Sequence, residues 1–173
     1  MTNRPSEVPP DYPSYIQQLA RTYRFLDRYK ERCSVEVLRD PSRFNELEDF
    51  LWAFFQNCWH LKDWIRNDET LSRALRDSIW HDVKDCRELL IVADLANGSK
   101  HFARCPEKEW VGATERQITL SRTSTGQSWT SHEIELATGD RFSALQIAEE
   151  GMVAWSRILE QHGMHYFGSA LAT

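Results

Sequence analysis

The spacing of apolar residues predicts a mainly helical protein with about four helices. In four stretches of the chain apolar residues recur every three or four positions, which is the spacing of one face of a helix. The first stretch begins near Ser14, and the others cover about residues 41–66, 69–97 and 143–162. The third stretch is long, and a break near Trp80 and His81 is an open alternative to one continuous helix.

The second of these stretches is the most apolar, and it is apolar on two faces. Asp40 and Pro41 form a helix start signal, with Asp as the N-cap and Pro at the first helical position. One face then carries a stripe of six residues: Leu47, Leu51, Phe54, Cys58, Leu61 and Ile65. Trp52 and Trp59 lie seven residues apart on a different face. Such a helix is expected either at the centre of a bundle or in an interface.

A change of pattern after Pro106 predicts a β-hairpin before the last helix. Polar and apolar residues alternate in two short runs, and Ser124–Gln127 between them reads as a turn, so we expect a hairpin over about 115–137. A second turn is expected at 138–140. The predicted fold is therefore a helical bundle of about four helices with a small β-hairpin inserted before the last helix. Residues 1–13, rich in proline, are expected to form a disordered tail, and residues 14–173 a single domain.

Composition narrows the class of protein and its compartment. A hydrophobic fraction of 41% is typical of a folded globular protein, and a net charge of −5 argues against indiscriminate binding to nucleic acid or anionic membrane. The four cysteines lack the paired spacing of zinc sites, and no apolar run approaches a membrane span. We therefore expect a cytoplasmic protein with reduced thiols. Seven tryptophans are unusual, and Trp52 with Trp59 would form a contiguous apolar patch, which predicts a homodimer.

The strongest candidate for chemistry is the end of the third helical stretch. Asp94, Asn97 and His101 are spaced by three and four residues, so a continued helix would place them on one face. One interpretation is an acid–base site with His101 as the proton carrier and Asn97 as the orienting group. The other is a helix C-cap, in which Asn97 and Gly98 end the helix and Lys100 and His101 lie near its negative end.

A long helix that ends in Asn97-x-x-Lys100-His101, within a helical chain of this size, resembles the HEPN superfamily. These are helical domains of bacterial toxins, phage-defence proteins and RNA-processing factors. Their motif is an Arg, commonly followed by Asn, with a His four to six residues after the Arg, and in the ribonucleases it forms a composite site across a dimer. Asn97 and His101 match the later positions, but Ala96 occupies the arginine position. The resemblance implies at most weak ribonuclease activity, with Lys100 and Arg104 as auxiliaries that lack the motif's spacing.

Two further groups of residues were candidates for binding. Four arginines lie along one face of the first helix: Arg21, Arg24, Arg28 and Arg32. They could follow a phosphate backbone, or they could be the solvated face of an amphipathic helix. In the second helix His60 and Asp63 could contribute to a metal site, although a histidine at the boundary of the core is the simpler interpretation.

Three hypotheses follow from the sequence. The first is a HEPN-like protein of a bacterial or phage defence, toxin or RNA-handling context, in a catalytically degenerate form. The alternative is a non-catalytic dimeric protein-interaction or regulatory module, and the third is a metal-dependent hydrolase. The chain contains no Gly-rich phosphate loop, Gly-x-Ser-x-Gly elbow, His-Glu-x-x-His or Cys-x-x-Cys motif. We therefore expect no cofactor and no metal.

Overall fold

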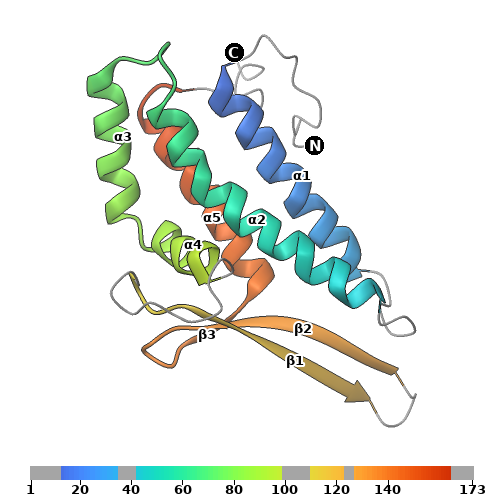
Figure 1. The fold of residues 1–173 in the computed structure, drawn as a ribbon. Helices are drawn as coiled ribbons and strands as arrows, with labels where there is room; N and C mark the ends of the chain where they lie inside the picture. Colours follow the sequence, from blue (N-terminus) through green and yellow to red (C-terminus); the bar gives the residue numbers. More distant parts are fainter. Residues whose placement is uncertain (1–12, 35–41, 99–109, 123–126, 165–173) are drawn as a thin grey trace.

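The computed structural model describes residues 13–34, 42–98, 110–122 and 127–164, and confirms the mainly helical class with a hairpin before the last helix. Figure 1 shows the helices packed as a bundle, with the sheet across one end. The elements within these ranges are α1 (Ser14–Ser34), α2 (Ser42–Arg66), α3 (Arg73–Asp85), α4 (Arg87–Gly98), β1 (Thr114–Arg122), β2 (Gln127–Glu135), β3 (Arg141–Ser143) and α5 (Ala144–Gln161). None of the helices in this part of the chain is both long enough and apolar enough to cross a bilayer.

Helix α2 occupies the centre of the bundle. It contacts α1, α3, α4 and α5, and in Figure 1 it lies between α1 and α3. The stripe predicted from the sequence is buried along its whole length, from Leu47 to Ile65. Its second apolar face is buried as well at Trp59, which the α3 side of the bundle covers. The two apolar faces of this helix are therefore explained by its central position.

The third helical stretch, for which the sequence left one helix or two open, is two helices, and the break lies at Cys86, further along the chain than Trp80 and His81. Residue Cys86 has an extended backbone (φ −91°, ψ 106°) and separates α3 from α4. Helix α3 starts only at Arg73, because Ser72 caps it by accepting a hydrogen bond from the Leu75 amide (3.2 Å). The physical reason for the break is burial: α3 buries one stripe, whereas α4 is buried on nearly all sides from Ile91 to Ala96. A straight continuation of α3 would not take this segment into the core.

The predicted hairpin is present, and a short third strand extends it. Strands β1 and β2 pair antiparallel from Thr114↔Glu135 to Arg122↔Gln127. The turn expected at 138–140 then returns the chain to β3, which pairs with β2. Ser143 ends this strand and caps α5 by accepting a hydrogen bond from the Gln146 amide (3.0 Å). A three-residue strand is too short to show alternation, so the sequence pattern could not indicate it.

Asp68 connects the start of α1 to the turn between α2 and α3. Its carboxylate accepts hydrogen bonds from the Ser14 hydroxyl (3.1 Å) and from the Thr70 hydroxyl (2.6 Å) and amide (3.0 Å). Burial alone would raise the pKa of Asp68, but these hydrogen bonds and one from the Tyr15 amide outweigh it, and the pKa is lowered. The ionised carboxylate therefore stabilises the folded state.

We predict that Asp68→Asn lowers the free energy of unfolding by about 1–3 kcal/mol at neutral pH, because the amide is a weaker acceptor for these donors. The folded pKa lies below the unfolded value of about 3.9, so the stabilisation is present above that pH and is lost as pH falls through the folded pKa. The difference between wild type and variant should therefore shrink in acid. Urea unfolding measured stepwise from neutral pH to the acid limit of folding would test this.

Asp77→Asn is the matched control, because Asp77 is exposed on α3 and its one partner among the described residues is Arg73, at 3.6 Å. Its effect should stay within about 0.5 kcal/mol at every pH. A difference between wild type and Asp68→Asn that does not change with pH would contradict the prediction.

Candidate functional site

Asp94, one member of the predicted cluster at the end of α4, has a structural role. Its side chain is buried, and its carboxylate accepts hydrogen bonds from three backbone amides, those of Trp110 (2.7 Å), Val111 (2.8 Å) and Ala113 (3.2 Å). Such a set of N–H groups is what a buried carboxylate needs to remain stable. Asp94 therefore anchors residues 110–113, the segment before β1, and its carboxylate is fully engaged in this structural role.

The conformation of that segment depends on Gly112. Its φ is +66°, a region that favours glycine, and a Cβ at this position would lie 2.8 Å from the Cβ of Ala137. With no side chain at this position, the amides on either side can converge on Asp94. This arrangement also fixes Trp110, whose side chain is 45% exposed.

The motif positions at the end of α4 are only partly described. Asn97 is half-buried, so its amide is not forced into the core. Lys100, His101 and Arg104 lie outside the described residues. Ala96, at the position where the family motif has arginine, is completely buried. An arginine side chain at this position would point into packed core, which explains why the chain carries a small residue there.

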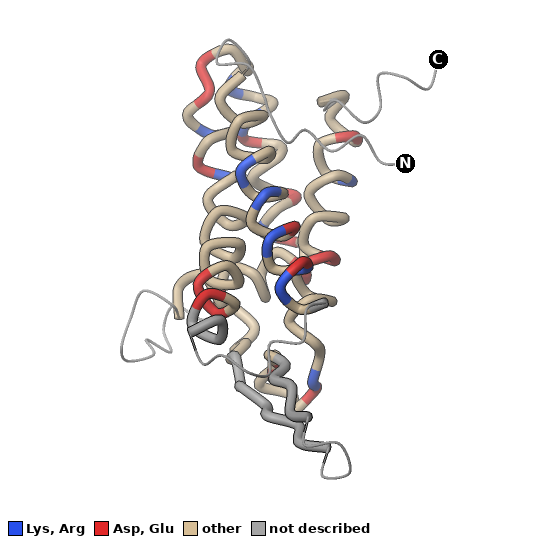
Figure 2. Tube along the Cα trace, turned by 90° about the vertical axis from the view of Figure 1, so that its right-hand side faces the viewer, with Lys and Arg blue, Asp and Glu red and all other residues tan. Residues whose placement is uncertain are grey.

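The four predicted arginines of α1 have different surroundings. Figure 2 shows basic residues following one another along this helix, with acidic residues between them. The Arg21 guanidinium lies 5.5 Å from the centre of the Trp64 ring, and that of Arg28 lies 5.8 Å from the Phe50 ring. Both are exposed, and within the described residues neither pairs with a carboxylate. Arg24 is half-buried.

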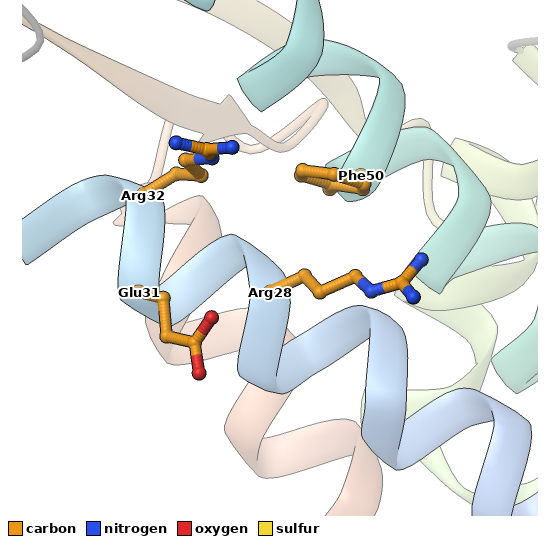
Figure 3. A pocket seen from close by; sticks show the side chains of 4 residues that line it. All are labelled: Arg28, Glu31, Arg32 and Phe50. Carbon is orange, nitrogen blue, oxygen red and sulfur yellow. The ribbon is translucent and has the colours of Figure 1, made fainter.

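Arg32 differs because its guanidinium forms an ion pair with Glu46 of α2 (3.2 Å). A hollow of about 380 Å³ lies between these two helices and is lined by Arg28, Glu31, Arg32 and Phe50. In Figure 3 the side chains of Arg28 and Arg32 approach the hollow from α1, the Phe50 ring from α2, and the Glu31 carboxylate points away from Phe50. Of the two guanidiniums at the hollow, that of Arg32 is paired with Glu46. That of Arg28 has no carboxylate partner within the described residues and lies beside the Phe50 ring.

The predicted apolar patch of Trp52 and Trp59 does not exist as an exposed pair. Trp59 is only 6% exposed, because its ring packs against Trp80 of α3 (6.3 Å between ring centres) and Trp110 (6.4 Å). Trp52 is half-buried, and its indole N–H donates to Glu48 (3.2 Å). This is a correction: the face that looked free from the sequence of α2 is covered by α3 and by the segment before β1.

The sequence did not reveal the cluster that covers Trp59. Three cations surround Trp80: Lys62, Arg66 and Lys84, whose charged groups lie 5.9, 6.0 and 5.7 Å from its ring centre. Lys62 also lies 4.8 Å from the Trp59 ring. The only signal in the sequence was local, a basic residue one turn after Trp80 on the same helix. The three tryptophans belong to separate segments, so their contact required the fold.

The second candidate group, around His60, does not come together as a metal site. Asn57 accepts hydrogen bonds from Gln18 at its carbonyl (2.9 Å) and its side chain (3.1 Å), and Asp63 pairs with Lys62 (2.6 Å). Across the part of the chain that the structure describes, no three His, Cys, Asp or Glu residues are grouped so as to hold a metal ion. Burial raises the pKa of the Cys58 and Cys86 thiols, so these two buried cysteines are poor nucleophiles.

No family model, no curated protein and no solved structure matches this chain. A functional proposal must therefore be based on the residues and contacts described above.

Proposed function

We propose that this protein binds RNA through the exposed arginines of α1 and is a HEPN-like protein without effective ribonuclease activity. The defence, toxin or RNA-handling context that the resemblance implies is part of the same proposal. The observation that carries it is the pair Arg21 and Arg28. Each guanidinium is exposed, packs against an aromatic ring of α2 and is not neutralised by a carboxylate within the described residues.

An arginine that packs against an aromatic ring remains available to phosphate. The ring carries no charge, so the guanidinium beside it keeps its own charge for a phosphate. One N–H group of Arg21 donates to the side-chain oxygen of Gln18 (3.1 Å), which is also uncharged. Arg21 and Arg28 are seven residues apart on one face, about 10.5 Å along the helix axis, so both can contact one extended strand. The hollow beside Arg28 gives that strand a place where one nucleotide can lie against Phe50.

We predict that replacing both arginines, Arg21→Gln with Arg28→Gln, weakens binding to a short RNA oligonucleotide and flattens its salt dependence. Each lost phosphate contact should lower the slope of log K against log salt concentration by about 0.7 to 0.9. Fluorescence anisotropy of a labelled RNA at several salt concentrations would measure both quantities.

Arg32→Gln is the matched control on the same helix. Because Glu46 already neutralises Arg32, the control should change affinity and salt slope much less than either of the other arginines. If Arg32→Gln lowers the affinity and the salt slope as much as Arg28→Gln does, the pairing of Arg32 with Glu46 does not remove it from RNA binding, and the proposed distinction between the two arginines is wrong. If the double variant binds RNA like wild type, α1 is not the RNA-binding surface. If the wild-type protein does not bind RNA at all, the interaction-module alternative is favoured.

We predict weak or absent ribonuclease activity for the purified protein. The charge that builds up on the scissile phosphate needs a positioned donor, which can contribute about 10²–10³ in rate, and Ala96 supplies none. Incubation of wild type and His101→Ala with labelled RNA, with and without chelator, would test this. Robust cleavage that survives chelator and is lost in His101→Ala would contradict the prediction and make Lys100 or Arg104 the candidate donor. The reverse substitution, Ala96→Arg, is unsuitable as a test because this position is buried.

A homodimer stays a prediction, and it now depends on the resemblance, since Trp59 is buried within the protomer. The ribonucleases of the family form their site across a dimer, so a family member should be dimeric at micromolar concentration. Sedimentation equilibrium would decide this. A monomer over the whole concentration range would contradict the prediction without affecting the arginine proposal, which needs one protomer only.

A further inference from the structure

A second surface of the molecule, on the opposite side of α2 from α1, combines aromatic and basic side chains. The three tryptophans Trp59, Trp80 and Trp110 form a row in which Trp59 is the buried middle member. Trp80 is half-buried and Trp110 is exposed. At the edge formed by α2, α3 and the segment before β1, the row therefore exposes the indole of Trp110 and part of that of Trp80.

The cations of this surface are largely uncompensated. Lys62 pairs with Asp63, but within the described residues neither Arg66 nor Lys84 pairs with a carboxylate. Both are exposed, and both lie within about 6 Å of the Trp80 ring centre. The three acids of α3 contact groups other than these cations: Asp77 faces Arg73, Asp82 bonds to His162 and Asp85 faces His81. The Trp80 ring is thus surrounded by three cations, of which only Lys62 pairs with a carboxylate within the described residues, in a protein of net charge −5.

We propose that Trp110 and Trp80, with Arg66 and Lys84, form a site for unpaired RNA, in which a base stacks on Trp110 and the adjoining phosphates contact the two cations. Exposed indoles beside basic side chains match a ligand that has a flat aromatic face and a negative charge in each repeating unit. A duplex does not fit, because its bases are already stacked and paired. The inference rests on the proposed RNA binding, to which it adds a preference for unpaired bases.

The position of Trp110 is suited to such a role. Its backbone amide is held by the buried carboxylate of Asp94 (2.7 Å), and its ring forms a T-shaped contact with that of Trp59 (6.4 Å between ring centres). The indole is therefore pre-positioned while its outer part stays exposed, and little conformational freedom is lost when a base stacks on it. Because its backbone anchor does not involve the side chain, a substitution at position 110 should leave the fold intact.

The test compares a labelled single-stranded RNA of about twelve nucleotides, a length within the span of one such site, with an RNA duplex of the same sequence. Trp110→Ala should weaken binding of the single strand by about fivefold or more, because one base loses its stacking partner, and should leave duplex binding unchanged. Trp110→Phe should retain most of the affinity, since phenylalanine keeps an aromatic face. Circular dichroism would confirm that both variants are folded.

A pair of variants on α3 tests the phosphate contacts. Lys84→Gln should weaken single-strand binding and lower its salt slope, whereas Arg73→Gln, which removes a cation that already faces Asp77 on the same helix, should not. Equal effects of these two variants, or equal affinity of Trp110→Ala and wild type for the single strand, would overturn the proposal.

The outcomes separate this inference from the proposed function. If binding depends on Arg21 and Arg28 but not on Trp110, the proposed function stands and the inference is wrong. If binding depends on Trp110 and Lys84 but not on the α1 arginines, the inference stands and the RNA-binding surface is on α3. If neither RNA binds, both are wrong. A single-stranded DNA of the same sequence, bound more tightly than the RNA, would overturn the choice of RNA as the ligand.

Discussion

At Gly151 the backbone of α5 comes so close to α2 and α4 that a side chain would not fit without a shift of its neighbours. A Cβ at this position would lie 3.0 Å from Cγ2 of Val92 and 3.7 Å from the sulfur of Cys58. Glycine within a helix costs about 0.5–1 kcal/mol relative to alanine, so its presence here reflects the close packing. One turn later Trp155 is fully buried, and its indole N–H donates to the carbonyl of Cys58 (3.0 Å). These contacts fix the last helix of the chain against the middle of α2.

The fixed central position of α2 determines where both candidate surfaces can form. With α4 and α5 packed on its apolar stripe, α2 presents one remaining side to α1 and another to α3. Phe50 and Trp64 lie on the first side and contact the arginines of α1, while Trp59 lies on the second beside Lys62. Aromatic residues that pack at the edge of the core thus also serve as supports for cations.

The sequence was sufficient for the features that depend on local spacing. The buried stripe of α2, the extent of the last helix and the turn after β2 all follow from periodicity and turn chemistry. Whether the third stretch was one helix or two stayed open, because the break at Cys86 results from the path that α4 takes through the core. The role of Asp94 was also missed. Its partners are backbone amides of a later segment, which come close only when Gly112 turns the chain. The spacing of residues along the helix cannot predict such contacts.

The surroundings of the candidate binding residues could not be predicted from the sequence either. The arginines of α1 could be listed from the sequence as a row of equivalent charges, but the structure divides them by what they contact on α2. A guanidinium that packs on a ring keeps its full charge for an incoming phosphate, whereas Arg32 would first have to give up Glu46. Trp59 was interpreted as exposed for a related reason: the residues that cover it come from other segments.

The difference between arginines that pack on a ring and the arginine that pairs with a carboxylate matters because the protein is acidic overall. Its net charge of −5 provides no long-range attraction for RNA, and at physiological ionic strength charges are screened beyond about 8 Å. Recognition would therefore depend on cations that lie within contact distance of the ligand and are not already paired. Within the part of the chain that the structure describes, cations without a carboxylate partner lie on two sides of α2, Arg21 and Arg28 on one and Arg66 and Lys84 on the other. In each case the aromatic neighbour holds the cation in place without neutralising it, which is how an acidic protein can keep short-range affinity for a polyanion while avoiding non-specific attraction.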